Sequence, residues 1–89
     1  QRHPYAQDIY WLIEVSKETL AKDLGEKSQT YARNGIPEYW IIDLVHKKLI
    51  VQTCPEAGKY QQRAEYTRGS ISPLAFPKLK IALEQLLLF

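Results

Sequence analysis

The sequence predicts a mixed α/β domain with a mixed sheet, in which a β-α-β crossover is followed by an antiparallel hairpin, a short C-terminal strand and a helical turn. Three observations support this prediction: an apolar run at residues 9–13, a second run at residues 39–42, and a helical pattern between them. The chain has 89 residues, of which 45% are hydrophobic and 25% are charged, as is usual for one globular domain. It has no internal repeat or linker, so residues 1–89 are expected to form a single domain.

The first strand is expected at residues 9–15, where aromatic, β-branched and aliphatic residues follow one another without polar alternation. Such a run is typical of a strand that is covered on both faces, as in a parallel sheet. The second strand is expected at residues 38–43 and is again mostly apolar. The two strands are far enough apart for a parallel crossover, which needs roughly a dozen residues or more.

The helix between these strands is expected to end at Arg33. The pair that follows, Asn34-Gly35, can take the left-handed conformation that terminates helices. The start of the helix is less well defined. Its candidate N-caps are Ser16, Thr19 and Asp23. Only the last of these is followed three residues later by a glutamate, which is the spacing of a capping box.

The second half of the chain is more polar, and its elements are expected to be shorter. An antiparallel hairpin at the sheet edge is predicted from strands at residues 48–53 and 59–66, joined by a turn at residues 55–58. A loop at residues 69–77 contains two prolines. A short strand at residues 79–82 and a helical turn at residues 83–89 complete the prediction.

Composition argues against several classes of protein. The net charge is +2, and the excess of seven Lys and Arg over three Asp and Glu in residues 46–89 is small for a dedicated nucleic-acid binder. The single cysteine, Cys54, cannot form an internal disulfide, and two histidines cannot supply a zinc-type ligand cluster. No apolar run approaches the length of about 20 residues that a membrane span requires. We therefore expect a cytoplasmic protein that does not contact a membrane.

A carboxylate and an ammonium interrupt the apolar pattern at two places. Glu14 closes the first apolar run, on the strand face that also carries Tyr10, Leu12 and Ser16. Lys27 follows thirteen residues later, on the helix stripe that also carries Leu24. Burying either charge unpaired is costly, so the two are expected to meet near the C-terminal end of the first strand, where open α/β sheets bind ligands. Such a pair suits phosphoryl chemistry in which the carboxylate holds a divalent ion and the ammonium orients water.

Several segments resemble the Uma-two family of endonucleases, which is placed in the restriction-endonuclease-like PD-(D/E)XK nuclease superfamily. The matching segments are Glu14-Val15-Ser16, Gly25-Glu26-Lys27, Tyr31 to Gly35, and above all Ile36-Pro37-Glu38-Tyr39-Trp40-Ile41-Ile42-Asp43. The resemblance implies a restriction-endonuclease-like core that cleaves DNA with Mg²⁺ or Mn²⁺. In this core Glu14 is the acidic, metal-binding residue of the third motif. Ser16 stands where that motif usually has lysine, and the resemblance implies that Lys27 supplies the ammonium instead.

The resemblance also implies a second acidic ligand, the aspartate of a Pro-Asp motif on a neighbouring upstream strand. Asp8 is the only acidic residue that precedes Glu14. Along one strand their side chains would lie roughly 20 Å apart, whereas two ligands of one ion lie within about 5 Å of each other. The chain also begins at Gln1 and contains no methionine. We therefore expect the C-terminal fragment of a larger nuclease domain, weak or inactive by itself.

Other residues with reactive side chains have simpler interpretations. Asp43 is favoured as a turn-starting residue, and His46 as an exposed side chain. Three aromatic residues are expected in the core instead of stacking on a substrate: Tyr31, Tyr39 and Trp40. Two lysines are expected at the solvated surface instead of competing with Lys27: Lys17 and Lys22.

Two functions stay open from the sequence. In the first, the chain is part of a Mg²⁺-dependent DNA endonuclease with Glu14 and Lys27 as catalytic residues; pairing of two copies as a homodimer would suit cleavage of both DNA strands. In the second, it is a non-catalytic interaction or regulatory remnant. Glu14 and Lys27 would then form a buried structural ion pair that fixes the helix over the sheet.

Overall fold

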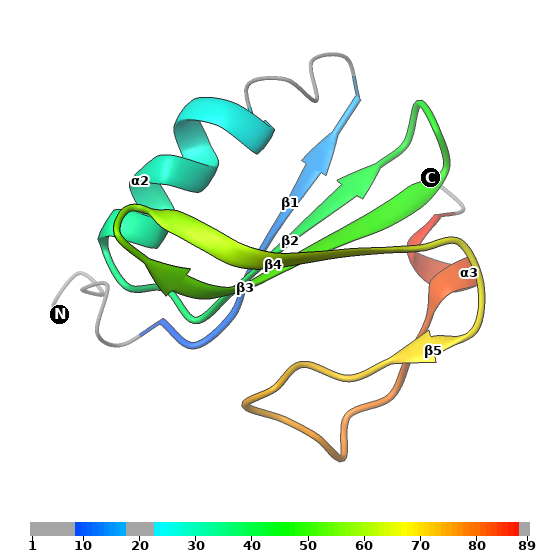
Figure 1. The fold of residues 1–89 in the computed structure, drawn as a ribbon. Helices are drawn as coiled ribbons and strands as arrows, with labels where there is room; N and C mark the ends of the chain where they lie inside the picture. Colours follow the sequence, from blue (N-terminus) through cyan, green and yellow to red (C-terminus); the bar gives the residue numbers. More distant parts are fainter. Residues whose placement is uncertain (1–8, 18–22, 88–89) are drawn as a thin grey trace, which may run out of the picture.

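The computed structural model describes residues 9–17 and 23–87, which form six strands and three helical segments (Figure 1). The strands are β1 (Leu12–Ser16), β2 (Glu38–Asp43), β3 (Lys48–Glu56), β4 (Lys59–Tyr66), β5 (Ser70–Ile71) and β6 (Ile81–Ala82). The helical segments are the π-helix η2 (Asp23–Lys27) and the α-helices α2 (Ser28–Arg33) and α3 (Leu83–Leu86). This order confirms the predicted α/β class.

Four strands form the main sheet, in the order β1-β2-β3-β4. β1 and β2 run parallel on either side of the helical segment, whereas β2, β3 and β4 are antiparallel neighbours. The predicted crossover and the predicted edge hairpin are therefore both confirmed. In the register of the parallel pair, Glu14 lies opposite Ile41 and Ser16 lies opposite Asp43. Figure 1 shows the ends of both parallel strands at the same edge of the sheet.

The sheet separates two hydrophobic clusters, because successive side chains of a strand point to opposite faces. On the face toward α2, the buried residues are Tyr39, Ile41 and Ile50. On the other face, they are Trp40, Ile42, Leu49, Val51, Leu83 and Leu87. The second cluster includes the C-terminal helix, so the chain segment from β5 to α3 covers the sheet face opposite α2 (Figure 1). The sheet is thus packed on both sides.

The prediction that both faces of the first strand are covered is wrong. β1 lies at the edge of the sheet, where Ile13 is 37% exposed and Val15 is 48% exposed. The C-terminal layer packs on β2 and β3 and leaves this part of the outer face open. An apolar composition predicts a strand but does not fix its place in the sheet, which depends on contacts made by distant segments.

The helical segment ends where the sequence predicts. Gly35 has φ +73°, its N–H donates to the carbonyl of Ala32, and the N–H of Ile36 donates to the carbonyl of Tyr31. These two bonds make a Schellman motif, which only a residue in the left-handed conformation can close. Ser16 is not a helix cap, since it is the last residue of β1; Thr19 lies outside the described residues.

The hairpin is tighter than predicted. β3 extends to Glu56, and only Ala57 and Gly58 form the turn, with φ of +54° and +75°. Two consecutive positive φ angles are typical of a type I′ turn, whose twist matches that of the flanking strands. In addition, the predicted C-terminal strand shortens to residues 81–82 and pairs with β5 in a separate small sheet. Among the described helices, none has the length and apolar character to cross a membrane.

Candidate active site

Glu14 lies at the middle of β1, on the sheet face that α2 covers. Both oxygens of its carboxylate accept hydrogen bonds from phenols. The hydroxyl of Tyr31 donates to Oε1 at 2.9 Å, and the hydroxyl of Tyr39 donates to Oε2 at 3.2 Å. β1 continues to Ser16, one residue beyond the predicted end, so Glu14 lies two residues before the C-terminal end of the strand. The carboxylate is fixed in direction by groups from two other elements.

Lys27 approaches the same carboxylate from the last residue of η2. Its Nζ lies 3.3 Å from Oε2 of Glu14, so the structure brings together the two charges that the sequence singles out. The pair is not sealed from solvent: the Lys27 side chain is 49% exposed and that of Glu14 is 21% exposed. The ammonium is therefore not buried as expected, although Lys27 does lie on the helix face toward the sheet, where it reaches Glu14. The stem of a lysine can lie along apolar surface while its ammonium reaches water.

The sequence predicts that Tyr31 and Tyr39 belong to the core, but it does not reveal that their hydroxyls reach Glu14. Their rings do pack together, with centroids 4.9 Å apart and planes at 77°, and Tyr39 is fully buried. A tyrosine buries an apolar ring and still carries one polar atom that needs a partner. The available signal was spacing, since Tyr31 follows Lys27 by one helical turn.

Asp43 ends β2 on the same sheet face as Glu14, and its side chain is 1% exposed. It accepts hydrogen bonds at Oδ1 from the backbone N–H groups of Val45 and His46, and Oδ2 lies 2.8 Å from Nδ1 of His46. Burial alone would raise the pKa of Asp43, but these hydrogen bonds and the nearby imidazole outweigh burial and lower it. Asp43 thus has the turn-starting position that the sequence favoured.

Asp43→Asn is expected to flatten the acid limb of the stability profile. A lowered folded-state pKa contributes stability that is present above the unfolded pKa of about 4 and is lost as the pH falls through the folded pKa. Asparagine keeps an oxygen for the two backbone N–H groups but does not titrate. The free energy of unfolding, measured in urea between about pH 2.5 and 7, should fall less in the variant than in the wild type.

The control for this experiment is Glu56→Gln, which neutralises an exposed carboxylate elsewhere. That variant should follow the wild-type profile. If Asp43→Asn and the wild type lose stability in parallel as the pH falls, the pKa of Asp43 is not lowered by folding.

The remaining candidates do not join the site. Lys17 is exposed beyond the end of β1, as predicted. The side chain of His46 is 65% exposed, with its ring held by Asp43. Trp40 is fully buried on the opposite sheet face, where its indole N–H donates to Glu38. Asp8 and Lys22 lie outside the described residues.

A divalent cation such as Mg²⁺ fits this site through Glu14 alone. The carboxylate is partly exposed, and three contacts leave part of its acceptor capacity free. Magnesium is commonly bound by one or two carboxylates, with waters and substrate phosphates completing its shell. Within residues 9–17 and 23–87, no group of three or more His, Cys, Asp or Glu side chains is placed to hold a metal ion. Of the residues described at this site, Glu14 is thus the one whose chemistry would suit such a shell.

Comparison with known proteins adds one finding. A family model named Uma2, described as "Putative restriction endonuclease", matches residues 1–84, which is nearly the whole chain. The four-stranded mixed sheet with its helical crossover fits a restriction-endonuclease-like fold. Among curated proteins, none matches the chain.

Proposed function

Because the chain belongs to the Uma2 family, whose model covers residues 1–84, we propose that Glu14 and Lys27 are catalytic residues of a metal-dependent DNA endonuclease. One observation carries the proposal: a carboxylate and an ammonium lie 3.3 Å apart on a sheet face and stay open to solvent. A purely structural ion pair does not need to be open to solvent. A catalytic pair does, because a substrate phosphate and a metal ion must reach it.

Each residue of the proposed site has a role that follows from its chemistry. Glu14 is the metal ligand, for Mg²⁺ or Mn²⁺, and the bound ion would supply a Lewis acid for the phosphodiester and an activated water. Lys27 places positive charge beside the reacting phosphate, where negative charge grows in the transition state. Tyr31 and Tyr39 are positioning residues, since their hydroxyls hold the two oxygens of Glu14 in place.

The second acidic ligand would come from a segment outside the described residues. β1 lies at the edge of the sheet, and among the described strands only β2 pairs with it. Just before β1, the buried indole N–H of Trp11 has no hydrogen-bond acceptor among the described residues. A strand added beside β1 would lie next to Glu14 and could bring a second carboxylate to it. We propose that this chain is the C-terminal part of the complete nuclease domain and has little activity alone.

The alternative is a non-catalytic remnant in which Glu14 and Lys27 only hold the helix on the sheet. The observed exposure argues against a large structural role, because exposed ion pairs contribute about 0–1 kcal/mol. The loss of about 3–5 kcal/mol that follows removal of one partner applies to fully buried pairs. Substitution of Lys27 therefore distinguishes the two functions: it should lower activity if the pair is catalytic, and stability if the pair is structural.

Lys27→Met in the full-length protein is expected to lower kcat for DNA cleavage about 100-fold, with a small change in KM and metal affinity. Methionine keeps the length of the stem and removes the charge. The free energy of unfolding should change by less than about 1 kcal/mol, because the pair is half-exposed. Steady-state cleavage of plasmid DNA in Mg²⁺ and unfolding in urea measure the two quantities.

The matched control is Lys48→Met. Lys48 also forms an ion pair, with Glu65 at 3.0 Å, but it lies on β3, which β2 separates from β1. It should leave kcat within about twofold, as expected for an exposed pair outside the site. Full activity of Lys27→Met together with a loss of more than about 3 kcal/mol in stability would favour the structural remnant.

A further inference from the structure

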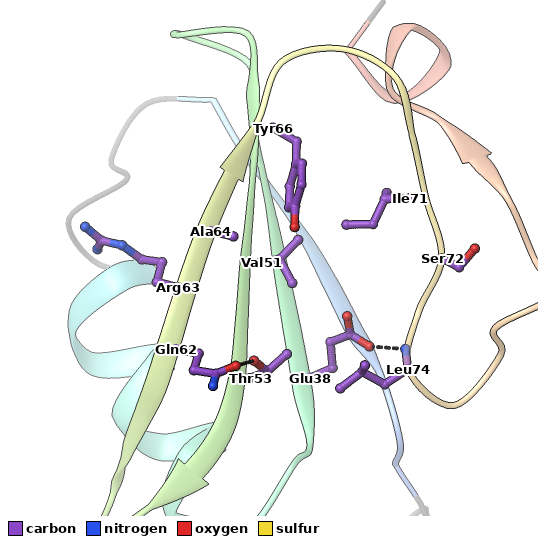
Figure 2. A pocket seen from close by; sticks show the side chains of 10 residues that line it. All are labelled: Glu38, Val51, Thr53, Gln62, Arg63, Ala64, Tyr66, Ile71, Ser72 and Leu74. Atoms are coloured by element: carbon purple, nitrogen blue, oxygen red, sulfur yellow. Dashed lines mark hydrogen bonds between the residues drawn. The ribbon is translucent and has the colours of Figure 1, made fainter.

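A pocket lies on the sheet face opposite α2, whereas Glu14 lies on the face that α2 covers. It has a volume of about 370 Å³ and opens between the β3-β4 hairpin and the segment at residues 71–74 (Figure 2). Its lining includes Glu38, Val51, Ala64, Tyr66, Ile71 and Leu74. Pockets of about 300–1,000 Å³ with apolar walls and a few polar groups are typical of small-molecule sites.

The pocket is bordered by a buried carboxylate. Glu38 is 2% exposed. Its Oε1 accepts a hydrogen bond from the backbone N–H of Leu74 at 2.7 Å, and its Oε2 accepts one from the indole N–H of Trp40 at 2.7 Å. Both donors are neutral, so neither brings a positive charge to the carboxylate.

No cationic side chain in the described part of the chain pairs with Glu38. Arg63 borders the pocket, but Figure 2 shows its guanidinium pointing away from the cavity. Buried carboxylates in proteins are ordinarily paired with a cation or bound to a metal. A buried acid beside an open cavity is therefore a place where a positive ligand would be stabilised.

The other walls indicate which kind of cation fits. Val51, Ile71 and Leu74 supply apolar surface, and Figure 2 shows the side chain of Tyr66 extending into the pocket with its hydroxyl inward. An aromatic ring also attracts a nearby ammonium. A metal ion is not favoured here, because both oxygens of Glu38 already accept hydrogen bonds and no group of three or more His, Cys, Asp or Glu side chains among the described residues is placed to hold one.

We propose that this pocket binds a small organic ammonium ion. Its charged nitrogen would lie against the carboxylate of Glu38, and its hydrocarbon part would contact Val51, Ile71 and Leu74. Glu14 lies opposite Ile41 of β2, and residues of odd and even number on β2 face opposite sides of the sheet. Glu38 therefore lies on the other face from the Glu14–Lys27 pair, and the two sites are separate. The proposal therefore does not depend on nuclease activity.

The test compares n-butylammonium with n-butanol, which has the same hydrocarbon length without the charge. Each is titrated into the ¹⁵N-labelled chain at constant ionic strength, and the amide of Leu74 and the indole of Trp40 report on Glu38. Saturable shifts of both signals with n-butylammonium, and at least tenfold weaker binding of n-butanol, are expected. Equal affinities for the two compounds, or shifts that do not saturate, would overturn the proposal.

Two variants probe the site in different ways. Glu38→Gln removes the charge, and Ala64→Leu fills the pocket while leaving Glu38 in place; each should weaken n-butylammonium binding at least tenfold. Should Glu38→Gln fail to fold, Ala64→Leu still decides the outcome. Glu56→Gln, which neutralises an exposed carboxylate outside the pocket, is the control and should bind as the wild type does. Unchanged binding by folded Ala64→Leu would contradict the assigned pocket.

Discussion

Glu14→Gln in the full-length protein is expected to reduce Mg²⁺-dependent DNA cleavage at least about 100-fold, because it removes an anionic metal ligand. Glutamine has almost the same shape and can still exchange hydrogen bonds with Tyr31 and Tyr39. The fold should therefore persist. The loss should appear in kcat/KM for plasmid cleavage and in the concentration of Mg²⁺ or Mn²⁺ needed for half-maximal rate.

A second measurement on the same variant separates metal binding from chemistry. If Glu14 binds the ion, Mg²⁺ or Mn²⁺ should raise the Tm of the wild type and not that of Glu14→Gln, since a ligand stabilises the state that binds it. Glu65→Gln is the matched control, because Glu65 also contacts a lysine but lies on β4, at the opposite edge of the sheet from β1. Undiminished cleavage by folded Glu14→Gln would exclude Glu14 as the metal ligand.

Trp40→Ala is expected to destabilise the chain by about 3–5 kcal/mol, the usual cost of truncating a large buried aromatic residue. Trp40 is fully buried at the centre of the sheet and makes an edge-to-face contact with Trp11, with ring centroids 4.9 Å apart. Its indole N–H is also one of two donors to Glu38. A small domain has a total stability of about 5–15 kcal/mol, so much of the margin would be lost.

Urea unfolding measures this loss of stability. Two further variants separate the contribution of the hydrogen bond from that of packing, and the buried ring from an exposed one. Trp40→Phe retains most of the ring volume and removes the N–H, so it isolates the hydrogen bond to Glu38 from the packing. Phe76→Ala truncates another aromatic neighbour of Trp11 that is 48% exposed, and it should cost less than about 1 kcal/mol. Similar losses for Trp40→Ala and Phe76→Ala would show that the core is not centred on Trp40.

Most of the fold could be predicted because its signals are local. β2 and β4 have the predicted bounds, and the helix ends at Arg33 because Gly35 can adopt a positive φ. The errors concern long-range placement. β1 has the apolar composition of a central strand, yet it lies at the edge of the sheet. The segment at residues 69–77 was expected to be a loop, but it contains β5, which is stabilised by pairing with a strand ten residues later.

The candidate site was predictable to a similar degree. Strand parity and helix periodicity predicted that Glu14 and Lys27 converge, and the structure places them in contact. Their catalytic roles stay a prediction. The two tyrosines were missed because each also packs as a core residue, and only the geometry shows where a hydroxyl points. The buried position of Glu38 was missed for the same reason, since its donors come from Trp40 and from Leu74, a residue 36 positions away.

The β-α-β unit, the hairpin and the two charges in an apolar pattern can all be read from the amino-acid sequence, because periodicity, turn residues and caps act over a few neighbouring residues. How exposed those charges are, and which groups hold them, follows from the folded arrangement. Burial and hydrogen bonding depend on side chains that distant segments bring together. Glu14 and Lys27 are for this reason an open, phenol-supported pair at a sheet edge, and not the buried ion pair that composition alone allowed.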